Sequence, residues 1–198
     1  MVVKCIKNKI SDFINNKKMY NNLIQLYNDI DKIFYIKLEE YYVVYAIEVD
    51  NIDYNFFICL DSSDEYPVPY YYSFFEIIDS RFSKYWITDS DSVSWDTTNK
   101  KKLISETIVS FSEWKMSNGL FYEQLIDGNA YEVELFKRYK AKMDLEFKNP
   151  NITDKVIRLQ NNWIQCPICF YVWEETNKGE MVICQNCKKL LLADASSA

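Results

Sequence analysis

Four cysteines close to the C-terminal end carry the clearest chemistry in this sequence of 198 residues. They form two Cys-x-x-Cys pairs, and 14 residues separate one pair from the other. Each pair can make a tight turn that aims two thiolates at one point, and an insert of hairpin length can bring the two turns together. Tetrahedral coordination by four thiolates is what Zn²⁺ favours. The spacing therefore predicts a zinc site with the ligands Cys166, Cys169, Cys184 and Cys187.

The predicted role of this zinc ion is structural. Four thiolates complete a tetrahedral coordination sphere, so no position is left for a catalytic water molecule. A module of this size has little hydrophobic core, and the metal would supply most of its folding free energy. An iron–sulfur cluster is the chemical alternative, but a polar ribbon gives such a cluster little burial. Free or disulfide-linked cysteines are a further alternative, which the spacing of the two pairs disfavours.

The segment around the cysteines resembles the zinc-ribbon class over residues 163–192. The resemblance rests on the Cys166-Pro-Ile-Cys169 turn, the aromatic stretch that follows it and the second Cys-x-x-Cys pair. We expect three strands in this segment, at residues 170–173, 180–183 and 188–192. Zinc ribbons serve many functions, so the resemblance does not fix a role. Residues 163–198 carry three lysines against four acids, and without a basic stripe nucleic-acid binding is disfavoured.

The sequence lacks several residue types on which common catalytic sites depend. It contains no histidine, which removes Ser-His, Cys-His and His-metal arrangements. Its three glycines are too far apart for a phosphate-binding glycine-rich loop. No catalytic residue is therefore assigned. One alternative is a metal-dependent enzyme acting on a phosphate-containing substrate, with a divalent cation held by two carboxylate clusters, Asp61, Asp64 and Glu65 and then Asp89, Asp91 and Asp96.

The charge of the chain favours a protein partner instead. The formal net charge is −6 and the isoelectric point is about 4.9, so the chain repels phosphate backbones and suits a basic protein. Acidic loops would steer such a partner, and exposed tyrosines would anchor it. Two alternatives stay open, in which the acids are ordinary solvated loops or the tyrosines form an edge strand packed on the core. The candidate partner-binding residues are Asp61, Asp64, Glu65, Tyr70, Tyr71, Tyr72, Asp89 and Asp91.

The rest of the sequence predicts an α+β fold, in which N- and C-terminal helices flank an antiparallel sheet and a zinc ribbon follows. Apolar residues at three- and four-residue spacing predict a helix over residues 8–31, with a bend or break at the polar residues 15–18. Runs rich in Tyr, Val, Ile and Phe predict an antiparallel meander with strands at residues 33–38, 41–49 and 54–60, and further strands at residues 70–78 and 85–88. Further helices are expected from Ser110 and at residues 120–126, 131–147 and 151–162. The charges of the helix at 131–147 are interpreted as a solvated outer face.

The chain is expected to comprise a body at residues 1–150, a connecting segment at 151–162 and the zinc ribbon at 163–198. Its first residues lack the uninterrupted apolar stretch of a signal peptide. No segment approaches the roughly 20 apolar residues that cross a bilayer. We therefore expect a cytoplasmic protein without membrane association, in a reducing compartment where paired Cys-x-x-Cys motifs favour metal over disulfides.

Two segments of the body resemble bacterial immunity proteins of the SUKH type. One is Phe57-Ile-Cys-Leu-Asp61, at the end of a strand-rich region, and the other is Ser110-Phe-Ser-Glu-Trp114, at the start of a helix. The resemblance implies a protein that acts by binding and neutralising a toxin. Together with the charge, it leads to the hypothesis of a non-enzymatic, cytoplasmic protein-binding protein. The metal-dependent enzyme and a nucleic-acid-associated zinc-ribbon protein are the alternatives.

Overall fold

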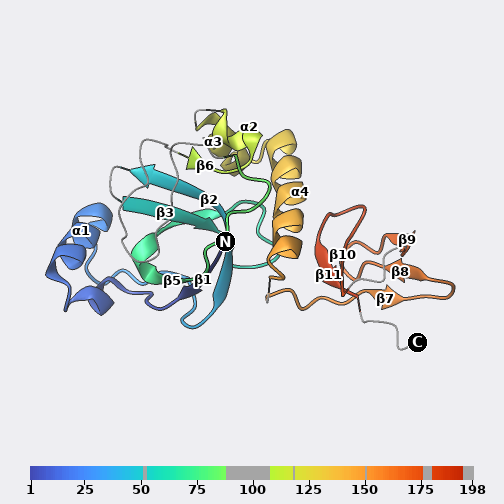
Figure 1. The fold of residues 1–198 in the computed structure, drawn as a ribbon, viewed down its shortest axis with the longest axis horizontal. Helices are drawn as coiled ribbons and strands as arrows, with labels where there is room; N and C mark the ends of the chain where they lie inside the picture. The colour runs from blue at the N-terminus through green and yellow to red at the C-terminus, as the bar shows by residue number, and fades with distance from the viewer. Residues whose placement is uncertain (51–52, 88–107, 118, 150, 176–179, 194–198) are drawn as a thin grey trace.

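The structure, a computed structural model, describes residues 1–198 except 51–52, 88–107, 118, 150, 176–179 and 194–198. A larger α+β body is followed by a smaller, β-rich C-terminal module (Figure 1). The elements of the body are β1 (Val2–Cys5), η1 (Ile10–Phe13), α1 (Lys17–Tyr27), β2 (Tyr41–Asp50), β3 (Asp53–Ile58), β4 (Val68–Tyr71), η2 (Tyr72–Phe74), β5 (Phe75–Asp79), β6 (Ile108–Val109), α2 (Ser112–Lys115), α3 (Leu120–Ile126) and α4 (Ala130–Glu146). The elements of the module are β7 (Ile157–Arg158), β8 (Trp163–Gln165), β9 (Val172–Glu174), β10 (Met181–Ile183) and β11 (Leu190–Leu192).

The body is built on an antiparallel sheet with the strand order β4-β3-β2-β1-β5, and β6 also pairs with β2. The predicted meander is confirmed for β2 and β3, which are neighbours in both sequence and space, and β4 pairs with β3 on its other side. The single strand expected at 70–78 is wrong, because η2 separates β4 from β5, and in the described part of 85–88 Ile87 forms only an isolated bridge with Ser110. Strand β1 was not expected, because its four residues include a lysine and give too short an apolar pattern. It lies between β2 and β5, so contacts far along the chain fix its structure.

The N-terminal helical region is divided, as its polar residues predict. The short helix η1 ends at Phe13, and α1 begins after Asn16, whose side chain accepts a hydrogen bond from the N–H of Met19 (3.2 Å). The strand expected at 33–38 is wrong. Phe34 and Ile36 are buried, but the N–H of Phe34 donates to the carbonyl of Asn8, so this segment packs on the core without joining the sheet.

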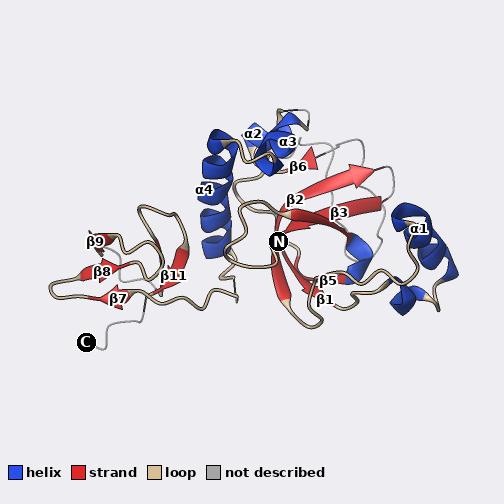
Figure 2. Ribbon diagram, turned by 180° about the vertical axis from the view of Figure 1, so that it is seen from behind, coloured by secondary structure: helices blue, strands red, loops and turns tan. Residues whose placement is uncertain are grey.

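Helix α4 lies between the sheet and the C-terminal module (Figure 2). It packs on β2 through the rings of Phe136 and Tyr45, whose centroids lie 5.6 Å apart in an edge-to-face arrangement. The interpretation of its charges as a solvated face is wrong for Glu132, Lys140 and Asp144, which are buried. None of the described helices combines the length and the apolar character that crossing a membrane requires.

The C-terminal module contains the sheet β7-β8-β9 and the hairpin β10-β11. Its expected strands are confirmed as β9, β10 and β11. The helix expected at 151–162 is wrong, because this segment pairs with the module instead. The N–H of Val156 donates to the carbonyl of Leu192 (3.0 Å), and β7 pairs with β8. A small separate core forms around Ile164, Trp173, Leu191 and the cysteines.

Candidate metal centre and adjoining cleft

The two Cys-x-x-Cys pairs lie in turns of the same design. We call residues 166–171 the first knuckle and residues 184–189 the second knuckle. In the first, the N–H of Phe170 donates to the carbonyl of Cys166 (3.0 Å), and the N–H of Cys166 donates to the carbonyl of Tyr171 (2.9 Å). These two hydrogen bonds hold the segment between them in a compact loop.

The second knuckle repeats this pattern at the equivalent positions. The N–H of Lys188 donates to the carbonyl of Cys184 (3.1 Å), and the N–H of Cys184 donates to the carbonyl of Lys189 (2.9 Å). The residue after the second cysteine is left-handed in both turns, with φ of 59° at Phe170 and 62° at Lys188. Each knuckle therefore offers its two sulfurs on a backbone of the same shape.

The four cysteine sulfurs converge as the sequence predicts, and all lie within 4.8 Å of one another. The Sγ atoms of Cys166 and Cys187 are 3.7 Å apart, and those of Cys169 and Cys184 are 3.6 Å apart. A tetrahedral ion with bonds of about 2.3 Å to sulfur places its ligands about 3.8 Å apart. Within the described part of the chain, this is the one group of three or more cysteine, histidine or acidic side chains that could hold a metal ion. The geometry fits a metal ion such as zinc.

The thiols of the cluster differ in their pKa. Desolvation raises the pKa of Cys169, but hydrogen bonds from the backbone of Tyr171, from Asn186 and from two neighbouring thiols outweigh it and lower the pKa to about 6. Burial raises the pKa of Cys187. Since the thiolate is the form that coordinates, a bound cation would have to displace the protons of the remaining thiols, and metal binding would release protons.

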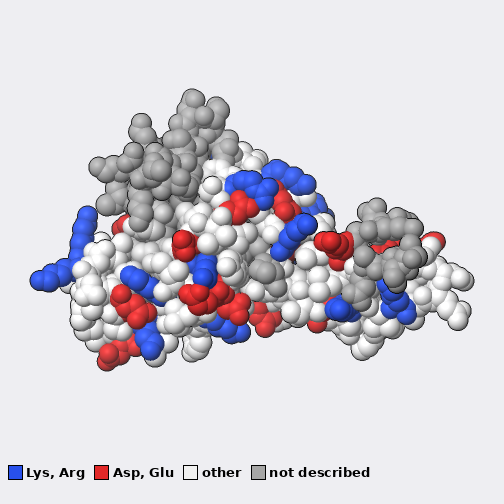
Figure 3. Space-filling model, turned by 60° about the horizontal axis from the view of Figure 1, so that its bottom comes forward, with Lys and Arg blue, Asp and Glu red and all other residues white. Residues whose placement is uncertain are grey.

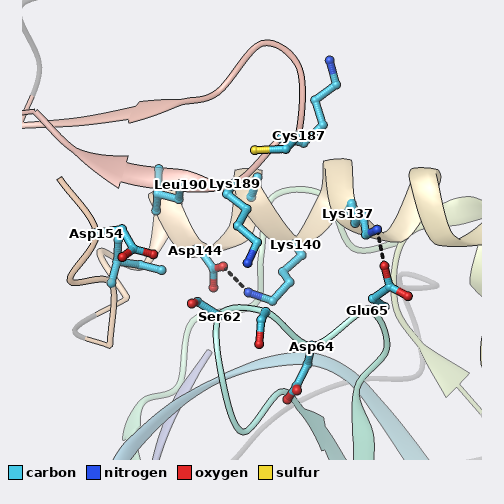
Figure 4. Close-up of a pocket in the computed structure, with 14 residues that line it drawn as sticks. Ser62, Asp64, Glu65, Lys137, Lys140, Asp144, Asp154, Cys187, Lys189 and Leu190 are labelled. Atoms are coloured by element: carbon cyan, nitrogen blue, oxygen red, sulfur yellow. Dashed lines mark hydrogen bonds and ion pairs between the residues drawn. The ribbon is translucent and has the colours of Figure 1, made fainter. Parts of the chain in front are cut away.

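A cleft of about 240 Å³ lies where the second knuckle meets the body (Figure 4). Helix α4 forms one wall, the loop between β3 and β4 forms another, and the module closes the third side. The side chain of Lys189 extends from the module toward Lys140 and Asp144 on α4 (Figure 4). The lining residues are Ser62, Ser63, Asp64, Glu65, Lys137, Lys140, Ala141, Asp144, Ile152, Asp154, Cys187, Lys188, Lys189 and Leu190.

A buried ion pair forms the base of this cleft. The Nζ of Lys140 lies 2.9 Å from Oδ2 of Asp144, and the two side chains are 9% and 2% exposed. The hydroxyl of Tyr45 and the side-chain amide of Asn149 both donate to Oδ1 of Asp144, at 2.6 and 2.8 Å. Burial by itself would lower the pKa of Lys140, but the charge and hydrogen bond of Asp144 together with the nearby Cys59 and Asp64 outweigh it and raise the pKa. The charge of this carboxylate is neutralised and both of its oxygens accept hydrogen bonds. Asp144 therefore links α4 to β2.

The acidic loop between β3 and β4 carries Asp61, Asp64 and Glu65, of which the last two line the cleft. Oδ2 of Asp64 accepts the N–H groups of Leu60 (2.7 Å) and Asp61 (3.0 Å). The pKa of Asp61 is lowered, chiefly by hydrogen bonds from the hydroxyl and N–H of Ser63. Glu65 forms an ion pair of 2.6 Å with Lys137. These interactions shape the loop and tie it to α4, and the three carboxylates do not form a metal cluster.

The other candidate partner-binding residues are placed differently. Tyr70 and Tyr71 are buried, and Tyr72 is half-buried and stacks on Tyr54 with ring centroids 4.1 Å apart. Strand β4 lies at the edge of the sheet, so of the two interpretations of this tyrosine run an edge strand packed on the core describes it. Asp89, Asp91 and Asp96 lie outside the described residues.

Sequence reasoning missed Lys140, Asp144 and Lys189 as cleft residues. A signal for the first two was available, because Phe136, Lys140 and Asp144 follow one another at four-residue intervals on the inward side of α4. Tyr45, which donates to Asp144, lies 99 residues away from it in the chain, so no local sequence pattern predicts this contact. Acidic and basic side chains are interspersed over the face of the molecule in Figure 3, without a continuous basic field there.

Comparison of the chain with protein-family models, with curated proteins and with solved structures finds no match. The resemblance to SUKH-type immunity proteins therefore gains no support from these comparisons. Its two segments lie at β3 with the following turn and at the junction of β6 with α2. A function for this chain has to be argued from its own surfaces and sites.

Proposed function

We propose that this chain is a non-enzymatic protein-binding protein whose C-terminal module is held together by a structural zinc ion. The observation that carries the proposal is the exposure of large apolar side chains on the module. Phe170 is 67% exposed, and Trp163, Ile157 and Leu159 of the same module are 43% to 45% exposed. Concentrated apolar exposure on a small folded unit is typical of interaction sites.

The chemistry of the metal centre supports a structural role. Its four sulfurs would saturate a tetrahedral zinc ion, so the ion would have no position for a water molecule or a substrate. The residues that would hold it are Cys166, Cys169, Cys184 and Cys187. The small core of the module makes the metal its main source of folding free energy.

The charge of the chain supports a basic protein as the partner. The net charge is −6, and association with a basic protein would be accelerated by that charge. A toxin-neutralising immunity protein in the cytoplasm is one form that this role takes. The acids nearest the cleft contribute to folding, since Asp64 accepts backbone N–H groups and Glu65 pairs with Lys137. They are therefore less suited to the enzyme alternative, which needs carboxylates that can hold a cation.

Affinity capture with the zinc-loaded full chain tests this function. We expect a basic protein to be retained in near-stoichiometric amount and identified by mass spectrometry. The same protein, purified, should bind the full chain with an affinity that falls as salt rises. The matched control is the full chain after chelation of the metal, which should retain less of the partner.

Two outcomes would contradict the proposal. One is that no protein is retained above the level seen with the chelated chain. The other is manganese-dependent hydrolysis of a phosphate ester by the full chain that is lost in Asp64→Asn, because that result would establish the enzyme alternative.

A further inference from the structure

We propose that the outer face of the β7-β8-β9 sheet, together with the first knuckle, binds an extended segment of a protein partner in which apolar residues stand beside Lys or Arg. This inference rests on the proposed protein-binding function and assigns it a surface and a partner chemistry. We call this surface the ribbon face. Its apolar residues are Ile157, Leu159, Trp163, Ile168, Phe170 and Val172.

The strand register separates the ribbon face from the core of the module. Ile157 pairs with Gln165, and Gln165 pairs with Val172, so these three side chains form one row across the sheet. Side chains alternate between the two faces of a strand, so the opposite face carries Ile164 and Trp173, which are buried. The apolar side chains of the outer row are exposed while the other face is already filled.

A side-chain hydrogen bond joins the first knuckle to this row. Nε2 of Gln165 donates to the carbonyl oxygen of Phe170 at 3.1 Å. The backbone of the knuckle therefore lies next to the outer row of the sheet. Ile168 and Phe170, both exposed, extend the apolar surface from the strands onto the metal-binding turn.

The backbone at Phe170 suits glycine better than a bulky residue, as it does at Lys188 in the second knuckle. A φ of 59° is costly for a bulky residue, and glycine would adopt it without that cost. The ring is 67% exposed, so burial does not compensate for the strain. The shared turn imposes this conformation on both residues, and the exposure of an aromatic ring is what distinguishes Phe170. An exposed aromatic ring on a metal-braced turn is suited to anchor a partner.

The charge of the ribbon face favours a segment of a partner over a second copy of this chain. Among its described residues, the face carries the exposed carboxylate of Glu174 and no basic residue. A second copy that met it with the same face would add another carboxylate and no opposite charge. The six apolar residues are 38% to 67% exposed, and an extended segment of a partner can cover them.

Charge on the ribbon face identifies the chemistry of that segment. Glu174 pairs with Trp163 across the strands, which places its carboxylate in the outer face, and it is exposed. Within the described residues, this carboxylate forms no ion pair or hydrogen bond. The basic neighbour Arg158 lies on the opposite face in register with Ile164 and pairs with Glu175 at 3.0 Å. A basic residue next to the apolar contacts of the partner would meet Glu174.

Selection from a random peptide library displayed on phage, against the zinc-loaded full chain, tests the proposal. We expect the enriched peptides to combine apolar residues with Lys or Arg. Fluorescence anisotropy with the enriched peptides should show at least tenfold weaker binding to Phe170→Gly and weaker binding to Glu174→Lys. Enriched peptides without basic residues, or equal affinity for the wild-type chain and Phe170→Gly, would overturn the proposal.

The second knuckle provides a matched control. Lys188→Gly removes a side chain from the equivalent left-handed position, at φ of 62°, without touching the ribbon face. Both glycine variants should retain one zinc ion per chain and the fold of the module, because glycine suits this backbone. Only Phe170→Gly should lose peptide affinity, and loss in Lys188→Gly as well would overturn the assignment of the surface.

Two further results separate this inference from the function on which it rests. A basic partner that is captured equally by the wild-type chain and by Phe170→Gly would overturn the ribbon face and leave the protein-binding function standing. Sedimentation that shows dimers of the wild-type chain and monomers of Phe170→Gly would assign the face to a second copy and overturn the proposed occupant.

Discussion

The two knuckles of the metal centre have the same backbone and opposite surroundings. Both close with a hydrogen bond of 3.0–3.1 Å from the residue after the second cysteine, and both hold that residue in the left-handed region. In the first knuckle this residue is Phe170, which is exposed to solvent. In the second it is Lys188, which lines the cleft against α4. The same type of metal-binding turn therefore lies against the body in the second knuckle and faces solvent in the first.

This difference shows that the two similar halves of one metal site can form two different surfaces. The second knuckle contributes Cys187, Lys188 and Lys189 to a cleft with the body, and Leu190, which follows it directly in β11, is buried there. The first contributes Ile168 and Phe170 to the exposed ribbon face. Metal binding requires only the cysteines and the turn, so the remaining positions are free to differ. We infer that the second knuckle positions the module and the first one presents it to a partner.

Metal removal should have the largest effect, and it should affect both knuckles equally. A structural zinc ion contributes about 10–16 kcal/mol of apparent binding free energy at pH 7 in small zinc modules. We expect one zinc ion per chain by elemental analysis. After chelation, the amide signals of strands β7 to β11 and of both knuckles should collapse in a nitrogen–proton correlation spectrum, while those of the body remain dispersed because its core is separate.

Single cysteine variants sharpen this test. Cys169→Ser and Cys187→Ser remove one ligand from each knuckle and should lower zinc affinity to a similar extent. Cys59→Ala is the control, since Cys59 is buried in the core of the body and should leave zinc affinity unchanged. Retained zinc and a folded module in either ligand variant would contradict the four-thiolate site.

The second largest effect is expected for Asp144→Ala, which should lower the stability of the body next to the second knuckle. This substitution leaves the ammonium group of Lys140 buried without its partner, which costs about 3–5 kcal/mol. We expect the free energy of unfolding from urea denaturation to fall by that amount. Glu65→Ala breaks the exposed ion pair with Lys137 in the same cleft and should cost about 1 kcal/mol or less. Equal losses in the two variants would show that burial of the first pair is not decisive.

The sequence predicted those parts of the molecule whose structure is decided by residues close to one another in the chain. The four cysteines are such a case, because ligand type and spacing define a tetrahedral site without reference to the rest of the fold. Strands β2 and β3, with their long β-branched and aromatic runs, and helix α3 are others. The break in the N-terminal helix was also visible, since Asn16 caps α1 locally.

The parts that failed depend on partners far along the chain. Residues 151–162 have apolar spacing that suits a helix, but Val156 and Ile157 pair with strands of the module instead. Lys140 and Asp144 were assigned to the solvent-exposed face because charged side chains normally stay hydrated. Hydrogen bonds from Tyr45 and Asn149 to Asp144 offset the free-energy cost of burying this pair. The two knuckles could not be distinguished either, since their different surroundings arise from how the module meets α4.

Glycine substitutions compare the two knuckles directly, with a smaller effect. Phe170→Gly and Lys188→Gly each relieve a left-handed backbone at a non-glycine residue, which is worth about 1 kcal/mol. We expect zinc affinity, measured by competition with a chelator, to rise by up to about fivefold in either variant. A rise in one variant only would mean that the knuckles differ in strain as well as in surroundings. A fall in Phe170→Gly would show that the aromatic ring stabilises the module.

The smallest effect is expected where the module and the body meet through an exposed ion pair. Lys148 and Glu180 lie 3.8 Å apart, and their side chains are 79% and 80% exposed, so water screens their attraction. Lys148→Ala should leave the melting temperature and the amide shifts of the second knuckle unchanged within error. Leu190→Ala removes a buried side chain directly after that knuckle and should shift those amides. The reverse result would mean that surface charge, and not the packing of the second knuckle against α4, holds the module in place.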